Sequence, residues 1–205
     1  MNDYLKQYIK EHLDLVDKEM YDELYSNCDK YDRADLTEFL LSCGIKPDEY
    51  MTRLPDYYLA GSDIDSYHIS PTINVIESWA FGYCRELKII YIPNSVTSIG
   101  NSAFYNCSNL ASVTISEGVT NIDVWAFRSC TSLTSITIPN SVTNIERKAF
   151  SNCARLNTIS YKGTVEEWKH IDIASGSFDN VLTSVVRCTD GVTGTEIRKK
   201  TNNYD

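Results

Sequence analysis

A period of 23 residues constrains this chain more than any other feature of its sequence. Ala-Phe pairs recur at Ala80-Phe81, Ala103-Phe104, Ala126-Phe127 and Ala149-Phe150, and a cysteine follows three residues after each phenylalanine. Two further columns keep the same period, at Leu87, Leu110, Leu133 and Leu156 and at Ile76, Ile99, Ile122 and Ile145. A strict period of this length predicts a solenoid, in which each repeat buries its apolar side by stacking on its neighbours.

Within one repeat, residues 133–138 read Leu-Thr-Ser-Ile-Thr-Ile. Alternation of apolar and polar residues predicts a short strand with one buried face, and stacked copies of it predict a parallel sheet. Pro93 or Pro139 ends the strand, because proline has no N–H to donate to a ladder. The chain then turns through Ser-Val-Thr-x-Ile to a segment around Ala-Phe, which we expect to form one helical turn.

The repeat resembles the BspA-like leucine-rich repeats. The resemblance rests on Ile-Pro-x-Ser-Val-Thr-x-Ile, Ala-Phe, Cys and Leu at fixed offsets, as in SVTSIGNSAFYNCSNLASVTI, and it covers residues 53–163. It implies an α/β solenoid, a stack of leucine-rich repeats with a parallel β-sheet. It also implies protein binding through a repeat surface, no enzymatic activity, and an origin in gut bacteria or their phages.

Three regions follow from this pattern. Residues 1–52 are expected to form a small α-helical N-terminal domain, and residues 53–163 the solenoid. Residues 164–205 are expected to form a C-terminal cap with a frayed tail. The first repeat, residues 53–70, is degenerate, and its Tyr57-Tyr58 pair is predicted to stand where later repeats have Ala-Phe.

The N-terminal region is predicted to contain three helices. Apolar residues spaced by three or four run from Leu5 to Cys28, with a break near residues 14–17. Asp17 is expected to cap a helix over residues 18–27, and Asp32 a further helix that Gly44 ends. This region either caps the open end of the stack, as solenoids require, or forms a separate interaction domain.

The C-terminal region is predicted to close the stack with a helix and strands. Thr164-Val-Glu-Glu is a capping box that opens a short helix through Trp168 and Ile171. Residues 181–188 have the pattern of a strand, Asp190-Gly191 that of a turn, and residues 194–198 that of a final strand. The YKGTVEEWK segment closely resembles the way in which BspA-like proteins commonly end.

The acidic net charge of the chain indicates which classes of partner it could bind. The net charge is −9, and residues 1–55 hold thirteen acids against seven bases, whereas residues 56–163 hold eight against seven. An acidic surface repels phosphates, so we expect no nucleic acid partner. A protein with a basic surface is the natural complement.

No run of about 18 apolar residues occurs, and the N-terminus is charged, so neither a membrane span nor a signal peptide is expected. We therefore expect the chain to act in the cytoplasm of the producing cell or of the infected host. Seven cysteines show no zinc-site spacing and are predicted to be buried thiols. His12, His68 and His170 lie in three different segments, and no nucleophile-base pair or phosphate loop is evident. No catalytic residue, metal or cofactor is predicted.

The first candidate binding surface lies on the expected sheet. Side chains alternate along a strand, so those on either side of buried Ile90 point outward. Most of the outward positions are serine or threonine, but His68, Ile89 and Tyr91 interrupt this pattern and predict a small patch. Either the helical region or a partner is expected to pack there.

The second candidate surface lies on the Ala-Phe side. Trp79 and Trp125 precede alanines at a position that holds Ser102 and Lys148 in other repeats, and we therefore expect it to face solvent. Tyr83, Tyr105 and Val124 are expected on the same side. Exposed tryptophan and tyrosine often dominate protein interfaces. The alternatives are that each ring lies flat over a neighbouring coil, or that it covers a contact between two copies of the chain.

These features predict a non-enzymatic protein-interaction module. The resemblance suggests a phage product that inhibits a host defence protein. A structural or virion-associated homo-oligomer is the first alternative. A small-ligand-binding protein is the second, with a pocket lined by His68, Ile89 and Tyr91.

Overall fold

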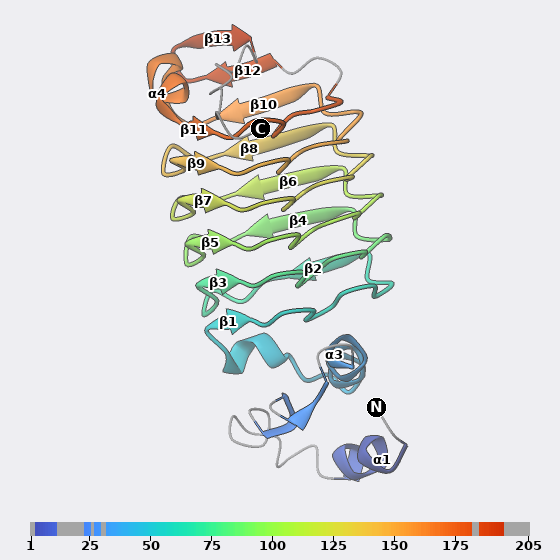
Figure 1. The fold of residues 1–205 in the computed structure, drawn as a ribbon. Coiled ribbons are helices and arrows are strands. Elements are labelled where there is room, and N and C mark those ends of the chain that lie inside the picture. Colours follow the sequence, from blue (N-terminus) through green and yellow to red (C-terminus); the bar gives the residue numbers. More distant parts are fainter. Residues whose placement is uncertain (1–2, 12–22, 26, 30–31, 182–184, 195–205) are drawn as a thin grey trace, which may run out of the picture.

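Two parallel sheets run the length of the coil stack in the computed structural model (Figure 1), which describes residues 3–11, 23–25, 27–29, 32–181 and 185–194. One sheet has the strand order β13-β12-β10-β8-β6-β4-β2, and the other the order β1-β3-β5-β7-β9-β11. Strands that follow one another in the chain alternate between the two sheets over most of the stack. Each full repeat therefore forms one coil, and the solenoid predicted from the period is confirmed.

The larger sheet consists mostly of four-residue strands whose every second side chain is buried. Its members are β2 Ser66–His68, β4 Ile89–Ile92, β6 Ser112–Ile115, β8 Ser135–Ile138, β10 Thr158–Tyr161, β12 Val185–Cys188 and β13 Gly191–Gly194, the last pairing antiparallel to β12. This is the expected sheet, except that the strand of the third full repeat begins at Ser135 and not at Leu133.

The second sheet was not predicted. It consists of two-residue strands in the Ser-Val-Thr-x-Ile segments and their counterparts: β1 Arg53–Leu54, β3 Val75–Ile76, β5 Ser98–Ile99, β7 Asn121–Ile122, β9 Asn144–Ile145 and β11 Asp172–Ile173. Two residues are too few to show the alternation by which a strand is recognised in a sequence. These strands form because the stack places identical segments side by side.

The four repeat phenylalanines form a continuous stack inside the coils. Centroid distances are 5.0 Å from Phe81 to Phe104, 5.0 Å from Phe104 to Phe127 and 5.3 Å from Phe127 to Phe150, with interplanar angles of 3° or less. All four rings are fully buried, as are the alanines that precede them. Parallel, offset rings at this distance add to the free energy gained from burial alone.

The Ala-Phe segment is not the helical turn that we expected. In the repeat that contains Phe81, the backbone N–H groups of Trp79, Phe81 and Tyr83 donate to carbonyl oxygens of the next coil, at N···O distances of 3.0, 2.8 and 2.7 Å. A helical turn would direct such donors back along its own chain. The prediction was wrong because alternate donors bond between coils, which produces a run of turns in place of a helix.

The cysteine column lies beside the phenylalanine stack. The thiols of Cys107, Cys130 and Cys153 each donate to a phenylalanine carbonyl oxygen of the preceding coil, at 3.0–3.2 Å. Cys84 donates in the same way to the Leu59 carbonyl, at 2.9 Å. All seven cysteines of the chain are free thiols, and these four are buried.

The first coil is one residue shorter than the 23-residue repeats that follow. The predicted alignment of Tyr57-Tyr58 with Ala-Phe is therefore wrong. Ser62 Oγ lies 3.6 Å from Cys84 Sγ, 22 residues further along the chain. Leu59 N–H donates to the Ala80 carbonyl just as Phe81 N–H donates to the Ala103 carbonyl. Tyr58-Leu59, not Tyr57-Tyr58, therefore stands in the place of Ala-Phe.

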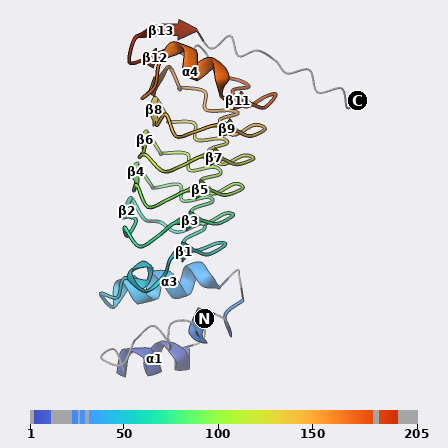
Figure 2. The same cartoon turned by 90° about the vertical axis from the view of Figure 1, so that its left-hand side faces the viewer.

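The helical region packs against this first coil. It contains α1 Asp3–Glu11, α3 Arg33–Ser42 and the 3-10 helix η2 Pro47–Tyr50. Figure 2 shows α3 across the end of the stack below β1. Leu36 and Leu40 of α3 share one hydrophobic core with Leu54 of β1.

Hydrogen bonds fix η2 to the solenoid. The carboxylate of Asp48, which is almost fully buried, accepts from the Ser70 N–H at 2.8 Å, and the Thr72 hydroxyl donates to the Asp48 carbonyl at 2.9 Å. These contacts hold η2 against the first coil, and whether the helical region serves only as a cap or also binds a partner stays a prediction.

Two details of the predicted N-terminal helices differ or lie outside the described residues. Asp32 precedes α3, but its side chain makes no capping hydrogen bond, because its backbone already has helical dihedral angles. Gly44 follows the helix with a φ of 82°, as expected of a residue that ends it. The helix predicted over residues 18–27 lies mostly outside the described residues. Those that are described, 23–25 and 27, are helical.

The stack continues beyond residue 163 by one further coil. Helix α4, Val165–His170, begins at the predicted capping box, in which the Thr164 side chain and Glu167 are bonded reciprocally. Strand β11 then pairs with β9, β12 pairs with β10, and Phe178 stacks on Phe150 at 5.2 Å. The predicted strand over residues 181–188 is β12, with residues 182–184 outside the described part. Strand β13 starts at Gly191, where a turn was expected, and residues 195–198 are not described.

We expect Phe104→Ala to lower the free energy of unfolding by about 3–5 kcal/mol, because it removes a ring from the middle of the buried stack. Urea denaturation followed by circular dichroism measures the change. Thr114→Ala, on the outward face of β6, is the control and should shift stability by no more than about 0.5 kcal/mol. An unchanged midpoint for Phe104→Ala would contradict the assignment of the core.

We also expect stability to fall at alkaline pH. Burial raises the pKa of the Cys84 thiol from 9.0 to about 11 and holds the pKa values of Cys130 and Cys153 well above 9.0. Below the ordinary thiol pKa both folded and unfolded chains keep these protons, whereas above it only the unfolded chain releases them. The free energy of unfolding should therefore decrease as the pH rises through this range.

Urea midpoints at neutral pH and at about pH 10, with reductant present, measure this loss. A Cys130→Ala, Cys153→Ala variant should lose less stability over the same pH interval than the parent chain. An equal loss in both proteins would show that the buried thiols are not its source.

Candidate functional site

Every coil contains two residues in the left-handed backbone region, four positions apart, on the outside of the Ala-Phe segment. The pairs are Tyr57 and Gly61, Trp79 and Tyr83, Ser102 and Asn106, Trp125 and Ser129, Lys148 and Asn152, and Gly176 and Asn180. Glycine and asparagine tolerate this conformation, whereas a bulky residue there is an outlier that costs on the order of 1–2 kcal/mol. The aromatic residues at these positions are therefore held at a cost to the backbone.

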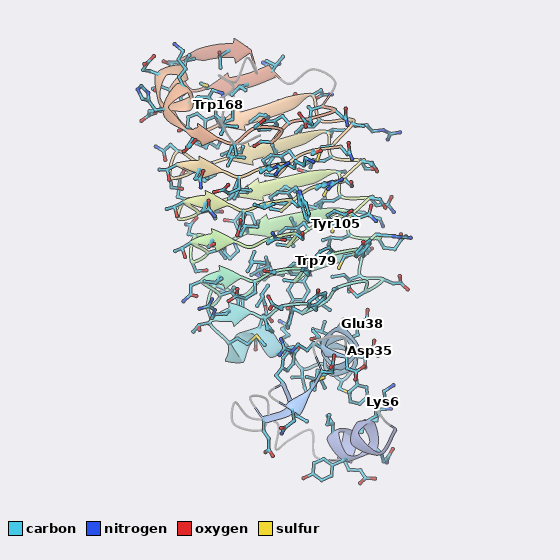
Figure 3. The ribbon with its side chains drawn as sticks, in the orientation of Figure 1. Lys6, Asp35, Glu38, Trp79, Tyr105 and Trp168 are labelled. Atoms are coloured by element: carbon cyan, nitrogen blue, oxygen red, sulfur yellow. The ribbon has the colours of Figure 1, made fainter. Side chains whose placement is uncertain are left out.

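Aromatic rings from these positions gather into one cluster. Trp79 stacks on Tyr57 and on Tyr83, at centroid distances of 6.1 and 5.9 Å, and packs against Tyr105 at 5.2 Å. Tyr83 and Tyr105 meet edge to face at 5.4 Å. Figure 3 shows Trp79 and Tyr105 side by side on successive coils. These contacts correspond to the alternative in which the rings lie over neighbouring coils.

Two arginines complete the cluster. The Arg128 guanidinium lies 5.4 Å from the Trp125 ring and 5.9 Å from the Tyr105 ring, and Arg85 lies 5.9 Å from the ring of Tyr83. These are cation–π distances. We call the set Tyr57, Trp79, Tyr83, Arg85, Tyr105, Trp125 and Arg128 the aromatic ridge.

The ridge is half-exposed, which partly corrects the expectation that this column faces solvent. Tyr83 is 40% exposed, and Trp79, Tyr105, Val124 and Trp125 are partly buried. Ser102, at the same position as the two tryptophans, is fully buried and donates to the Asn101 side chain. A serine in this column therefore did not indicate exposure, because its small side chain is covered by its neighbours.

Gly82 makes room for the Trp79 ring. A Cβ atom added at Gly82 would lie 2.8 Å from Cε3 of Trp79, closer than carbon atoms pack. The equivalent positions of later coils hold Tyr105, Arg128 and Ser151, so a side chain is otherwise tolerated in this column. The absence of one at Gly82 lets the indole lie close against the backbone.

Two buried hydrogen-bond donors of the ridge have no acceptor among the described residues. Nε1 of Trp125 and Nε of Arg128 are covered from solvent, and neither has an acceptor among the described residues. Buried donors in folded proteins are usually paired, so these two are exceptions that lie next to each other in the ridge.

The other predicted surface, His68, Ile89 and Tyr91, lies on the outer face of the larger sheet. His68 on β2 is the register neighbour of Tyr91 on β4. Ile89 and Tyr91 are 62% and 48% exposed, and His68 is also exposed. Side chains this open form a flat patch and not the lining of a pocket.

The sheet patch and the aromatic ridge lie on different sides of the coil. The patch is on the strands of the larger sheet, whereas the ridge is on the turns that follow the short strands. The structure thus brings together Trp79, Tyr83 and Tyr105, and places Trp125 beside Arg128 with Val124 as its neighbour in sequence. It separates all of them from the other three predicted residues.

Three residues of this surface were missed by sequence reasoning. Tyr57 was assigned to the wrong column, because the first coil is one residue short. Arg128 and Arg85 were not predicted as members of this surface. The alternation of aromatic and arginine side chains in one repeat column was the signal that could have found Arg128.

A cavity of about 550 Å3 lies under α4, lined in part by Tyr161, Glu166 and His170. Two of its polar side chains already have partners, since His170 Nδ1 lies 2.7 Å from the Glu166 carbonyl oxygen and Glu167 belongs to the capping box. Among the described residues no group of three or more His, Cys, Asp or Glu side chains could hold a metal ion. No helix in the same residues is long and apolar enough to cross a membrane.

The chain matches the model of a known family. The BspA type leucine rich repeat region matches residues 52–184 in six copies. The chain belongs to this family. The matched range contains all of the coils from β1 to the Phe178 stack, so the family assignment and the observed coils agree.

Solved structures of bacterial leucine-rich repeat proteins are similar to this chain. The leucine-rich repeat protein TpLRR of T. pallidum has 26% identity and a TM-score of 0.53, over 60% of this chain and 58% of that one. A leucine-rich cell surface protein of Faecalibacterium prausnitzii has 35% identity and a TM-score of 0.43, over 54% and 35% of the two chains. A leucine-rich repeat protein of Eubacterium ventriosum has 20% identity and a TM-score of 0.49, over 71% and 43%.

The match therefore spans less than two thirds of the length of each of these three proteins. The search of curated proteins gives no match.

We expect Gly82→Ala to displace the Trp79 ring, because the added methyl group and Cε3 cannot occupy the same space. Tryptophan fluorescence should become more accessible to iodide quenching. Ser151→Ala, at the equivalent position of a coil without an adjacent tryptophan, is the control. Equal quenching in Gly82→Ala and the parent chain would contradict the packing described here.

Proposed function

We propose that the chain is a protein-interaction module that binds its partner through the aromatic ridge. The observation that carries the proposal is that the bulky rings of Trp79, Tyr83 and Trp125 occupy left-handed positions that other coils fill mostly with glycine, serine or asparagine. Backbone strain of this kind is concentrated at functional sites, where the surrounding structure holds residues in conformations they otherwise avoid. Glycine or asparagine would complete the same turn at a lower backbone cost.

The composition of the ridge supports this proposal. Tryptophan, tyrosine and arginine are the residues in which binding energy is most often concentrated at protein interfaces. Here they are packed against one another, so that few rotamers would be lost when a partner binds. Membership of a leucine-rich repeat family, whose proteins generally bind other proteins, supports the same conclusion.

The narrower expectation, that a phage-encoded chain of this kind inhibits a host defence protein, remains a prediction. So does its action in the cytoplasm. The homo-oligomer and the small-ligand alternatives also remain open to test, although the exposure of His68, Ile89 and Tyr91 favours a flat contact over a pocket.

We expect a Trp79→Asn, Trp125→Asn variant to fold and to lose its partner. Asparagine tolerates left-handed dihedral angles, so the gain in backbone energy offsets part of the lost ring packing, and the urea midpoint should stay close to that of the parent chain. Affinity capture from host lysate, read by mass spectrometry, compares the two proteins.

Tyr91→Asn is the matched control, since it removes an exposed ring from the sheet patch. If Tyr91→Asn loses the partner and the double tryptophan variant retains it, the sheet patch is the binding surface and the ridge is a packing feature. Light scattering of the purified chain identifies self-association, which would favour the homo-oligomer.

A further inference from the structure

The turns that carry the aromatic ridge are locally basic, although the chain as a whole is acidic. Residues 78–86, 101–109, 124–132 and 147–155 hold five bases, Arg85, Arg128, Arg147, Lys148 and Arg155, against one acid, Glu86. The net charge of these four segments is thus +4, in a chain whose total is −9, although Glu77, Asp123 and Glu146 stand directly before three of them. The two charges are separated along the molecule, because the acidic excess is concentrated in residues 1–55.

These bases are not neutralised within the described structure. None of the five forms an ion pair with a carboxylate of residues 3–11, 23–25, 27–29, 32–181 or 185–194. Lys46, Arg53, Lys88 and Lys169, which lie elsewhere, each pair with a glutamate or aspartate.

The carboxylates nearest in sequence to the ridge are already engaged. Glu77 accepts from Arg53, Asp123 accepts from the Val124 N–H at 2.6 Å, and Glu146 accepts from Asn144 at 2.7 Å. Glu86, inside the turns, accepts from the Asn109 side chain at 3.4 Å. Only Glu77 is neutralised by a base, and none of these carboxylates pairs with a base of the turns. Arg85, Arg147 and Arg155 are exposed, so their charge is open to an external anion.

We propose that the aromatic ridge takes an extended acidic segment of a partner protein, an inference that rests on the ridge being the binding face. The Arg128 guanidinium lies over two rings, which leaves in-plane N–H donors for a carboxylate. Charge-assisted hydrogen bonds of this type are about twice as strong as neutral ones. The rings between the bases then contact the apolar or proline residues that lie between the acids.

An extended segment fits because the basic and aromatic residues follow the stack. Arg85, Arg128 and Lys148 come from three different coils, and successive coils are spaced by the distance between adjacent strands, about 4.8 Å. A polyproline-type segment advances about 9.3 Å in each three-residue turn, which is close to the spacing of two coils, and such segments dock on aromatic surfaces. An acidic partner segment differs from the basic partner surface that the net charge of the chain predicted. The net charge is set largely by the N-terminal region and not by the ridge.

Matched synthetic peptides test the proposal directly. An acidic peptide of repeated Pro-Glu-Glu, its neutral Pro-Gln-Gln counterpart and its basic Pro-Lys-Lys counterpart are titrated into the full chain, with oligo-dT of equal length as a nucleic acid probe. Tryptophan fluorescence reports binding, since Trp79 and Trp125 are partly exposed and Trp168 is 4% exposed. We expect only the acidic peptide to bind, with an affinity that falls as salt is added.

An Arg128→Gln, Arg147→Gln variant should bind the acidic peptide about tenfold more weakly. Arg187→Gln, which removes an exposed base from the larger sheet, is the control and should bind as the parent chain does. Circular dichroism establishes that both variants are folded.

Tighter binding of the basic peptide or of oligo-dT would overturn the proposal, as would equal weakening in the ridge variant and the control. No binding of the acidic peptide would overturn it as well. The proposed function fails separately, if the protein captured from lysate by the parent chain is also captured by the double tryptophan variant.

Discussion

Hydrogen bonds between successive coils determine most of the structure of this protein, both its core and its surface. In each Ala-Phe segment, alternate N–H groups donate to carbonyl oxygens one coil further on. This arrangement fixes the register of the stack, brings the phenylalanines face to face and places the thiols against neighbouring carbonyl groups. It also places two left-handed residues in every coil, and none of their side chains belongs to the phenylalanine stack.

The sequence period was sufficient to predict the solenoid, its larger sheet and its buried columns. The second sheet could not be predicted in the same way, because two-residue strands such as Ser98–Ile99 form only when neighbouring coils align. The helical turn predicted around Ala80-Phe81 was wrong for a related reason. Local sequence propensity predicts only hydrogen bonds within a segment, whereas in the stack the N–H groups of the segment find carbonyl acceptors in the next coil.

The candidate site was predictable in part. Trp79 and Trp125 were found because large rings stood where other repeats have smaller side chains, and Tyr83 and Tyr105 followed from the same alignment. The degree of exposure was not predictable, as Ser102 shows, because the cover over a small side chain depends on its spatial neighbours. Tyr57 could not be placed without knowing that the first coil lacks one residue.

At the paired left-handed positions, the backbone conformation is set by the fold of the solenoid, whereas the side chain is free to vary and mostly contributes to the surface. A residue there needs only to accept the backbone angles, since its side chain takes no part in the phenylalanine stack. Glycine, asparagine, serine, lysine, tyrosine and tryptophan all occur at these sites in the one chain. The side chain at such a position can therefore be substituted, and the binding properties of one coil changed, without a change in the fold of the next coil.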